Sequence, residues 1–225
     1  MSVVPGLQRS AKEAIILAAE RLMADHGFDG VSLRQIAAAA GNGNNSAVLY
    51  HFGTKHDLVR AVFDYRLPRL RQRRALLIAD RRPVDLRGWL ECQVRAVLEQ
   101  SELDDSHYMA FVASLRQHRD LEAFAQQRQE FVESQVEFDA NLRAHLAHLD
   151  EPVRTRRLDQ AMTIVIDTAA DRERARARGQ GVLPFPLELA NLLDGVVGFL
   201  AAPASATMPA ELDNGGVGAR CAVLL

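Results

Sequence analysis

The 225-residue chain is long enough for one large domain, or for a large and a small domain, at about 100 to 200 residues per domain. Hydrophobic residues make up 48% and charged residues 25% of the sequence, which is ordinary for a globular protein and excludes a wholly disordered chain. The formal net charge of -2 excludes a uniformly basic nucleic-acid coat protein, but it leaves room for a local basic surface.

Cysteine content and hydropathy exclude several further classes. Only Cys92 and Cys221 are present and they lie far apart, so neither a disulfide framework nor a four-ligand zinc site is indicated. No segment approaches the about 18 unbroken apolar residues of a membrane helix, and the first residues lack a basic start followed by an apolar run. We therefore expect a cytoplasmic protein that has no membrane partner and needs no cofactor.

The predicted elements at the start of the chain are three short helices. Nearly every periodic segment repeats at three and four residues, which predicts an all-α fold. The first helix covers 11–26 and ends at Gly27, and the second covers 33–40 with Ser32 as its cap. A Gly/Asn turn at 41–44 precedes a third short helix over 45–51.

Longer helices follow, and the pattern divides the chain into three parts. Thr54 can cap a long helix in which Pro68 introduces a kink or an end. The remaining predicted helices lie at 86–97, 108–115 and 121–149, from Pro152 onward, and at 187–202. These elements predict a helix-turn-helix domain over 1–54, a larger helical domain over 55–202 and a disordered tail over 203–225.

The two short helices 33–40 and 45–51 have the arrangement of a helix-turn-helix. In that motif the first helix lies against the DNA backbone and the second enters the major groove. Ile36, Val48 and Phe52 are expected to pack between the helices, which leaves amides, hydroxyls and an imidazole facing outward. The predicted DNA-binding residues are Ser32, Arg34, Gln35, Asn44, Asn45, Ser46, Leu49, Tyr50, His51, Thr54 and Lys55.

A structural interpretation of the same residues stays open. An Asn-Asn-Ser cluster is as often a turn and helix cap as a base-reading surface, and Tyr50 and His51 could equally be half-buried packing residues. The combination of a capped helix, a tight turn, a second short helix and flanking cations favours DNA binding.

Residues 11–58 resemble the DNA-binding head of the TetR family of bacterial transcriptional repressors. The resemblance rests on GFDGVSLRQIAAAAG, on NNSAVLYHFGTKHDLV and on the spacing of His51, Phe52, Lys55 and Leu58. The recognition segment is one residue longer than the family norm, so the family's phosphate-contacting tyrosine falls on Leu49, where Tyr50 can substitute. The resemblance implies a phosphate contact for Lys55 more firmly than base contacts for Asn44 and Asn45.

The resemblance also implies that the rest of the chain is a ligand-binding and dimerisation body, with dimers formed through the last two long helices. The apolar character of 187–202, and the room that Gly195 and Gly198 leave for a partner helix, point the same way. The alternative is the central buried helix of a monomer. The predicted dimer interface comprises Leu189, Leu193, Val196, Val197 and Leu200.

A small-molecule effector is expected to bind inside this body. Its predicted pocket residues are Phe63, Trp89, Tyr108, Phe111, Phe131 and Met162, although most of them are equally suited to plain core packing. His145 and His148 lack a third ligand at matching spacing, so we expect a solvated face there and no metal. The charged run 171–178 is expected to be an exposed helix end in preference to a second nucleic-acid site.

Together these features predict a homodimeric, ligand-responsive repressor that binds double-stranded operator DNA with a palindromic sequence. One alternative is a helical scaffold or adaptor whose helix-turn-helix is architectural, which would show no salt-dependent DNA binding. An all-α enzyme is the third class, but the sequence has no Gly-rich phosphate loop, no nucleophile elbow and no HExxH motif, so we predict no catalytic residues.

Overall fold

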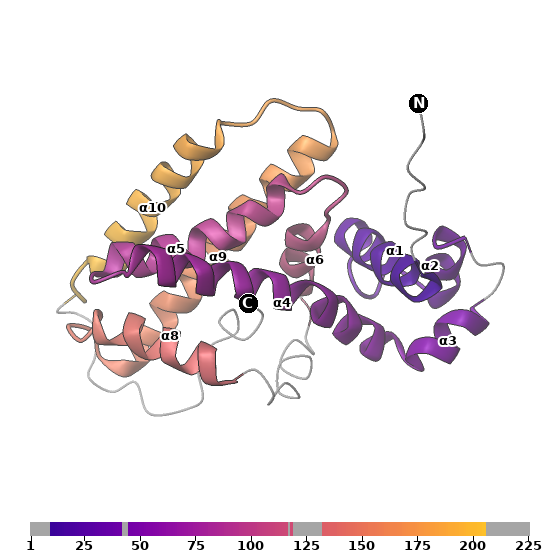
Figure 1. The fold of residues 1–225 in the computed structure, drawn as a ribbon, viewed down its shortest axis with the longest axis horizontal. Coiled ribbons are helices and arrows are strands. Elements are labelled where there is room, and N and C mark those ends of the chain that lie inside the picture. Colours follow the sequence, from indigo (N-terminus) through magenta and orange to yellow (C-terminus); the bar gives the residue numbers. More distant parts are fainter. Residues whose placement is uncertain (1–9, 42–44, 117, 119–131, 206–225) are drawn as a thin grey trace.

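The computed structural model describes residues 10–41, 45–116, 118 and 132–205. Within these ranges the regular elements are α-helices and one short 3-10 helix, with no β-strand. The predicted all-α fold is therefore confirmed. Figure 1 shows a small group of helices at one end of an elongated molecule and a larger group of long helices at the other.

The small group, which we call the head, contains α1 (Ala11–His26), α2 (Leu33–Ala39) and α3 (Ser46–Phe52). Helix α1 begins where the Ser10 Oγ accepts the Glu13 backbone N–H at 3.2 Å, and it ends at Gly27, whose φ of 73° suits a residue without a Cβ. The head helices thus begin and end within one residue of their predicted bounds.

Helix α4 (Lys55–Arg81) leads from the head into the larger group, which we call the body. The prediction that Pro68 would kink or end this helix was wrong about an end, because α4 continues to Arg81. Pro68 lies on the exposed side, where water can satisfy the carbonyl that loses its hydrogen bond. Buried Leu67 and Leu70 hold the opposite face of the helix in the core.

The body also contains α5 (Leu86–Leu98), the 3-10 helix η1 (Glu99–Glu102), α6 (Tyr108–Leu115), α8 (Val132–Ala144), α9 (Glu151–Ala177) and α10 (Phe185–Ala201). The first part of the helix predicted over 121–149 lies outside the described residues. Its predicted end was wrong, because α8 stops at Ala144 and turns follow it. Leu146 and Leu149 are buried within those turns, so their spacing indicated burial and not helix.

The head is packed onto the body along a continuous core. Helix α6 contacts both α1 and α9, and seven of its eight residues are buried. One hydrophobic cluster includes residues of α1, α2 and α3 together with residues of α4, α6, α9 and α10. Because this core is continuous, we expect a displacement of α6 or α4 in the body to shift the helices of the head.

None of the described helices combines the length and the apolar character needed to cross a membrane.

Candidate nucleic-acid interface

Helices α2 and α3 pack against each other through a small apolar contact. Ile36, Val48 and Phe52 are all buried, as the sequence predicted. The start of α2 is fixed by a capping box: the Gln35 backbone N–H donates to Ser32 Oγ at 3.3 Å, and the Ser32 N–H donates to Gln35 Oε1 at 2.8 Å. Ser32 and Gln35 are exposed, and Arg34 lies exposed between them.

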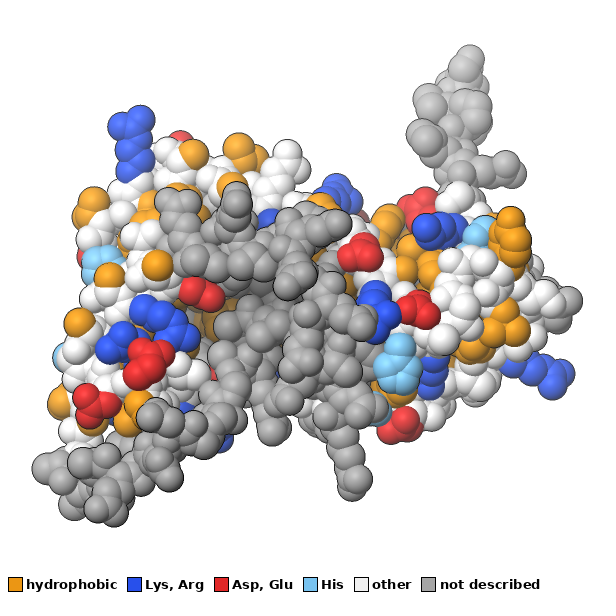
Figure 2. Space-filling view, turned by 90° about the horizontal axis from the view of Figure 1, so that it is seen from below, with side chains coloured by type: hydrophobic (Ala, Val, Ile, Leu, Met, Phe, Trp, Pro, Cys, Tyr) orange, Lys and Arg blue, Asp and Glu red, His pale blue; other side chains and the backbone are white. Residues whose placement is uncertain are grey.

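The outward face of α3 is open. Tyr50 is 85% exposed and Leu49 is 46% exposed, so neither side chain is part of the head core. His51 is also exposed, and its ring meets the Tyr50 ring edge to face at 5.2 Å between centroids. The interpretation of Tyr50 and His51 as half-buried packing residues is therefore wrong. In Figure 2 the head forms one end of the molecule and exposes both hydrophobic and cationic side chains.

The start of α3 is only partly a cap. Asn45 occupies the N-cap position and is exposed, but its side chain makes no capping hydrogen bond. This leaves the amide available for an external partner. Ser46 follows it and is also exposed, whereas Asn44 lies outside the described residues.

Lys55 is half-buried and contacts Phe28 of the head, and its phosphate contact stays a prediction. Its ammonium donates a hydrogen bond to the Phe28 carbonyl and lies 4.3 Å from the centroid of the Phe28 ring. Burial lowers the pKa of Lys55, and the nearby charge of Asp29 partly opposes that effect. Thr54 caps α4 by accepting the Asp57 N–H at 3.1 Å. Thr54 thus fixes where α4 begins, and Lys55 joins that start to the head.

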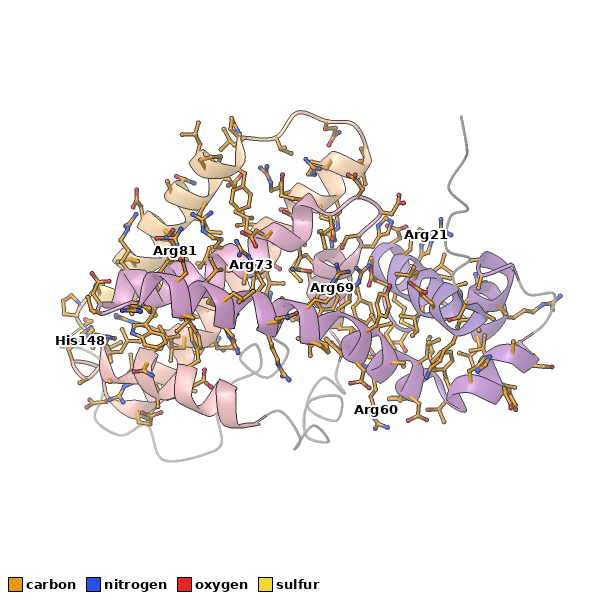
Figure 3. The ribbon with its side chains drawn as sticks, in the orientation of Figure 1. Arg21, Arg60, Arg69, Arg73, Arg81 and His148 are labelled. Atoms are coloured by element: carbon orange, nitrogen blue, oxygen red, sulfur yellow. The ribbon has the colours of Figure 1, made fainter. Side chains whose placement is uncertain are left out.

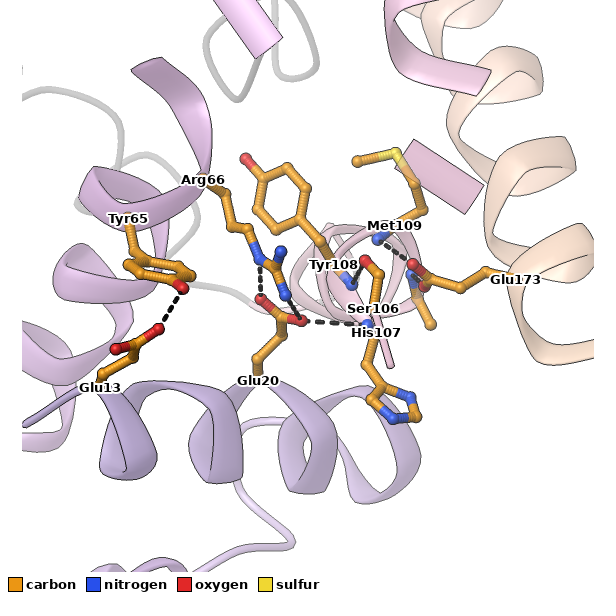
Figure 4. Close-up of polar contacts among 10 residues, drawn as sticks. Glu13, Glu20, Tyr65, Arg66, Ser106, His107, Tyr108, Met109 and Glu173 are labelled. Atoms are coloured by element: carbon orange, nitrogen blue, oxygen red, sulfur yellow. Dashed lines mark hydrogen bonds and ion pairs between the residues drawn. The ribbon is translucent and has the colours of Figure 1, made fainter. Parts of the chain in front are cut away.

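A buried polar cluster joins the head to the body, as Figure 4 shows. Arg66 of α4 donates two hydrogen bonds to the Glu20 carboxylate of α1, both at 2.7 Å. Glu20 also accepts the backbone N–H of His107 at 3.0 Å, just before α6. Beside them, the Tyr65 hydroxyl donates to Glu13 at 2.7 Å. Three elements that are distant in sequence therefore meet at Glu20.

Glu173 is the second acidic centre of this region. Its carboxylate accepts the backbone N–H groups of Met109 at 3.4 Å and Ala110 at 2.9 Å, and it is 3% exposed. Burial raises the pKa of Glu173 to about 7. Glu173 also lines an open cavity of about 690 Å³ beside the loop before α6 and the end of α9.

The prediction of an exposed helix end at 171–178 was wrong for two residues. Arg172 and Glu173 are buried, and Arg172 pairs with Glu102 at 2.6 Å. The signal that could have found them is spacing, because Glu173 follows Ile166 and Ala169 at seven and four residues, on the buried face of α9.

Among the described residues, the predicted pocket residues lie in more than one part of the body. Phe63, Tyr108 and Phe111 pack on one another with ring centroids between 5.6 and 6.4 Å apart, and all three are buried core residues. Trp89 is elsewhere, with its ring 5.9 Å from that of Phe138. Met162 is half-buried on α9, and Phe131 lies outside the described residues.

Trp89 and Phe138 border a cavity of about 220 Å³ between α4, α5 and α8. The α4 wall includes Arg71 and Arg74, two residues that the sequence interpretation did not select. The spacing of these arginines placed them on the face of α4 that also carries Leu67 and Leu70, but a charged residue on an apolar face is easily read as a solvated one.

The predicted dimer-interface residues are mostly internal to this chain. Leu189, Leu193, Val196 and Leu200 are buried within the chain, where α10 packs on α5 and α9, and Val197 is half-buried. The four buried side chains therefore pack within the protomer, but α10 is not buried on every side, and the dimer stays a prediction. The outward face of α10 instead carries Leu187, which is 59% exposed, together with Gly195 and Gly198, beside which there is open space.

His145 and His148 are exposed, and no group of three His, Cys, Asp or Glu residues in the described ranges is placed to hold a metal.

Comparison with known proteins finds one family match. Residues 15–62 match the model of the bacterial regulatory proteins of the tetR family. None of the curated protein sequences matches this chain.

Several solved structures are similar over most of their length. The fatty acid degradation regulator FadR from Bacillus halodurans is 18% identical, with 86% of this chain and 95% of that chain covered and a TM-score of 0.47. A transcriptional regulator from Rhodococcus sp. Rha1 is 22% identical, with 85% and 96% covered and a TM-score of 0.49. A TetR family transcription regulator from Marinobacter aquaeolei VT8 is 21% identical, with 82% and 94% covered and a TM-score of 0.45.

Proposed function

We propose that this chain, whose head is of the TetR family of bacterial regulatory proteins, is a cytoplasmic repressor that binds palindromic operator DNA as a homodimer and is released by a small-molecule effector. The observation that carries the proposal is the exposed face of α3 and its N-cap, which presents an amide, a hydroxyl, an imidazole and a phenol. The major groove is wide enough to admit such a helix. We expect no catalytic activity.

In this proposal α3 lies in the major groove. Asn45 reads an adenine edge, Leu49 contacts a thymine methyl group, and Tyr50 and His51 contact phosphates. Arg34 contacts the backbone from α2. The remaining predicted DNA-binding residues, Ser32, Gln35, Asn44, Ser46, Thr54 and Lys55, flank this surface, with Lys55 acting through the position of α4.

The dimer in this proposal forms through the outward faces of the last two helices. Gly195 and Gly198 have open space beside them, and Leu187 and Ile164 are exposed apolar side chains on α10 and α9. The buried residues of α10 support this face from behind. Two heads on one palindrome then contribute to binding together.

Release requires that the effector binds one arrangement of the heads more tightly than the other. Helix α4 is the element that connects the body to the head, and the Glu20–Arg66 pair ties it to α1. We propose that an effector in the body moves α4 and so changes the separation of the two heads. Distances between spin labels on the two heads, measured with and without effector, test this step, and an unchanged separation would contradict it.

The DNA contacts are tested by substitution after a duplex has been selected from a random pool. We expect His51→Ala to weaken binding to every sequence and Asn45→Ala to change the preferred sequence. His148→Ala is the matched control for His51→Ala, because His148 is exposed at the end of the body remote from the head (Figure 3). Equal losses on selected and random duplexes for Asn45→Ala would remove that residue from the base-reading set. If the folded chain selects no duplex, the helix-turn-helix is architectural and the protein is a scaffold.

A further inference from the structure

The cavity between α4, α5 and α8 combines apolar walls with two guanidinium groups. Ala75, Ile78, Trp89 and Phe138 supply the apolar surface, and Arg71 and Arg74 supply the charge. Its volume of about 220 Å³ is below the about 300–1,000 Å³ that is usual for a ligand pocket, so only a small molecule would fit.

Arg74 differs from the other buried arginines of this protein. Arg66 pairs with Glu20 at 2.7 Å, and Arg172 pairs with Glu102 at 2.6 Å. Arg74 is 2% exposed, yet no carboxylate among the described residues lies within ion-pair distance of it. Its hydrogen-bond partner there is a neutral group, the Gln93 side-chain oxygen, at 2.9 Å from Nη1.

The surroundings of Arg74 favour an additional negative charge. Burial, and then the charge of Arg71, lower the pKa of Arg74 to about 10, while Asp139 partly opposes them. The group therefore remains a cation at neutral pH. Among the described residues Arg74 is a buried cation with a neutral partner, which is costly, and an anion that enters the cavity would reduce that cost.

The Arg74 guanidinium also lies against an aromatic wall. Its Cζ is 4.7 Å from the centroid of the Phe138 ring, which in turn meets the Trp89 ring at 5.9 Å. Stacking on Phe138 holds the guanidinium plane, and the bond to Gln93 uses one of the five N–H groups that a guanidinium carries. Carboxylates match the guanidinium edge because both of their oxygens can accept from one guanidinium.

We propose that this cavity binds a small organic carboxylate, with the carboxylate on Arg74 and the apolar portion against Trp89 and Phe138. The ligand class is argued from the cavity alone, whereas the role of that ligand as the effector rests on the proposed function. A ligand there lies directly on α4, the helix that connects the body to the head.

The test uses the intrinsic fluorescence of Trp89, because it is the sole tryptophan of the chain. Purified protein without DNA is titrated with benzoate and octanoate, and with benzamide and octanamide as their uncharged counterparts. We expect a saturable change with at least one carboxylate, whose Kd is about tenfold or more below that of its amide. Equal affinity for acid and amide in both pairs, or no saturable change in folded protein, would overturn the proposal.

Substitutions assign the binding to Arg74. Arg74→Gln is expected to raise the carboxylate Kd about tenfold or more, and Arg74→Lys, which keeps the charge but loses the fork, to raise it less. Arg69→Gln is the matched control, since Arg69 is exposed on the same helix (Figure 3). An unchanged Kd in folded Arg74→Gln would contradict the assignment, and if that variant does not fold, Arg74→Lys and the acid-to-amide comparison decide it.

A parallel titration of the selected duplex separates this inference from the proposed function. Carboxylate binding that leaves DNA affinity unchanged would uphold the ligand class and refute the effector role. DNA binding by a protein that binds none of the carboxylates would refute the ligand class alone. Carboxylate binding by a folded protein that selects no DNA would uphold the ligand class and refute the regulator.

Discussion

At the scale of single residues, Lys55 is a cation beside the surface that we propose binds DNA, and we expect it to act by positioning α4. Its ammonium is held by the Phe28 carbonyl and ring. We expect Lys55→Met to lower the stability of the protein by about 1 kcal/mol and to weaken DNA binding on all sequences. The slope of log Kobs against log salt should stay the same, because no phosphate contact is lost.

Thermal unfolding and salt titrations of Lys55→Met check this expectation. A slope that falls by about 1 for each lost contact, in a variant of unchanged stability, would show that Lys55 contacts phosphate after all.

Glu173 gives the protein a pH dependence with a definite sign. Burial raises the pKa of Glu173 to about 7 from the ordinary value of 4.5. Between pH 4.5 and pH 7, therefore, the Glu173 side chain is protonated in the folded chain and ionised in the unfolded chain. The stabilisation is fully present below pH 4.5 and is lost as the pH rises through 7. A shift of this size corresponds to about 3 kcal/mol.

We expect Glu173→Gln to remove this fall in stability between pH 4.5 and 7, since glutamine does not titrate. Chemical denaturation of both proteins at pH 5 and pH 8 measures the difference, and other titrating groups cancel in the comparison. If both proteins lose stability equally over this range, the elevated pKa of Glu173 is refuted.

At the scale of elements, the helix bounds that depend on residues close in sequence could be predicted, and those that depend on tertiary packing could not. Helices α1, α2 and α4 begin at the caps Ser10, Ser32 and Thr54, each of which bonds to a residue three positions later. Because these bonds are local, the caps Ser32 and Thr54 could be predicted from the sequence. The end of α8 and the continuation of α4 through Pro68 depend on tertiary burial.

The same distinction explains which parts of the candidate site could be predicted. The exposed face of α3 follows from helical periodicity and a resemblance at fixed spacing. The cavity beside Arg74 needs α4, α5 and α8 to meet, and the burial of Glu173 needs α6 to lie across α9. Spacing places Glu173 and Arg74 on the buried faces of α9 and α4, but it does not say which helices pack on those faces.

The contact between α1 and α4 includes the buried Glu20–Arg66 pair. We expect Arg66→Met to destabilise the protein by about 3–5 kcal/mol, because it leaves the Glu20 carboxylate buried without its cation. The double variant Glu20→Gln/Arg66→Met should recover part of that loss, since glutamine can still accept the His107 N–H.

A double-mutant cycle in urea measures this coupling. Arg60→Met is the control, because its pair with Asp57 is partly exposed and should change stability by at most about 1 kcal/mol. Additive effects of the Glu20 and Arg66 substitutions would show that the pair does not couple the two helices.

At the scale of the whole molecule, the proposed dimer makes a prediction on the outward face of α10. A side chain at Gly195 meets open space in the single chain, so Gly195→Leu should leave protomer stability intact and obstruct a partner helix. Leu189→Ala is the contrasting variant, since Leu189 is buried and its truncation should cost about 2–5 kcal/mol.

Sedimentation of Gly195→Leu should show a shift toward single chains, together with weaker operator binding. A folded Gly195→Leu variant that keeps the mass of the unmodified protein would place the dimer interface elsewhere.

The most direct test of the central claim is the salt dependence of binding to a duplex selected by the purified chain, with the mass of the complex measured alongside. The account predicts two chains on a palindromic site and an affinity that falls linearly in log Kobs against log salt. A folded chain that binds selected and random duplexes equally, or binds neither at any salt concentration, would contradict it.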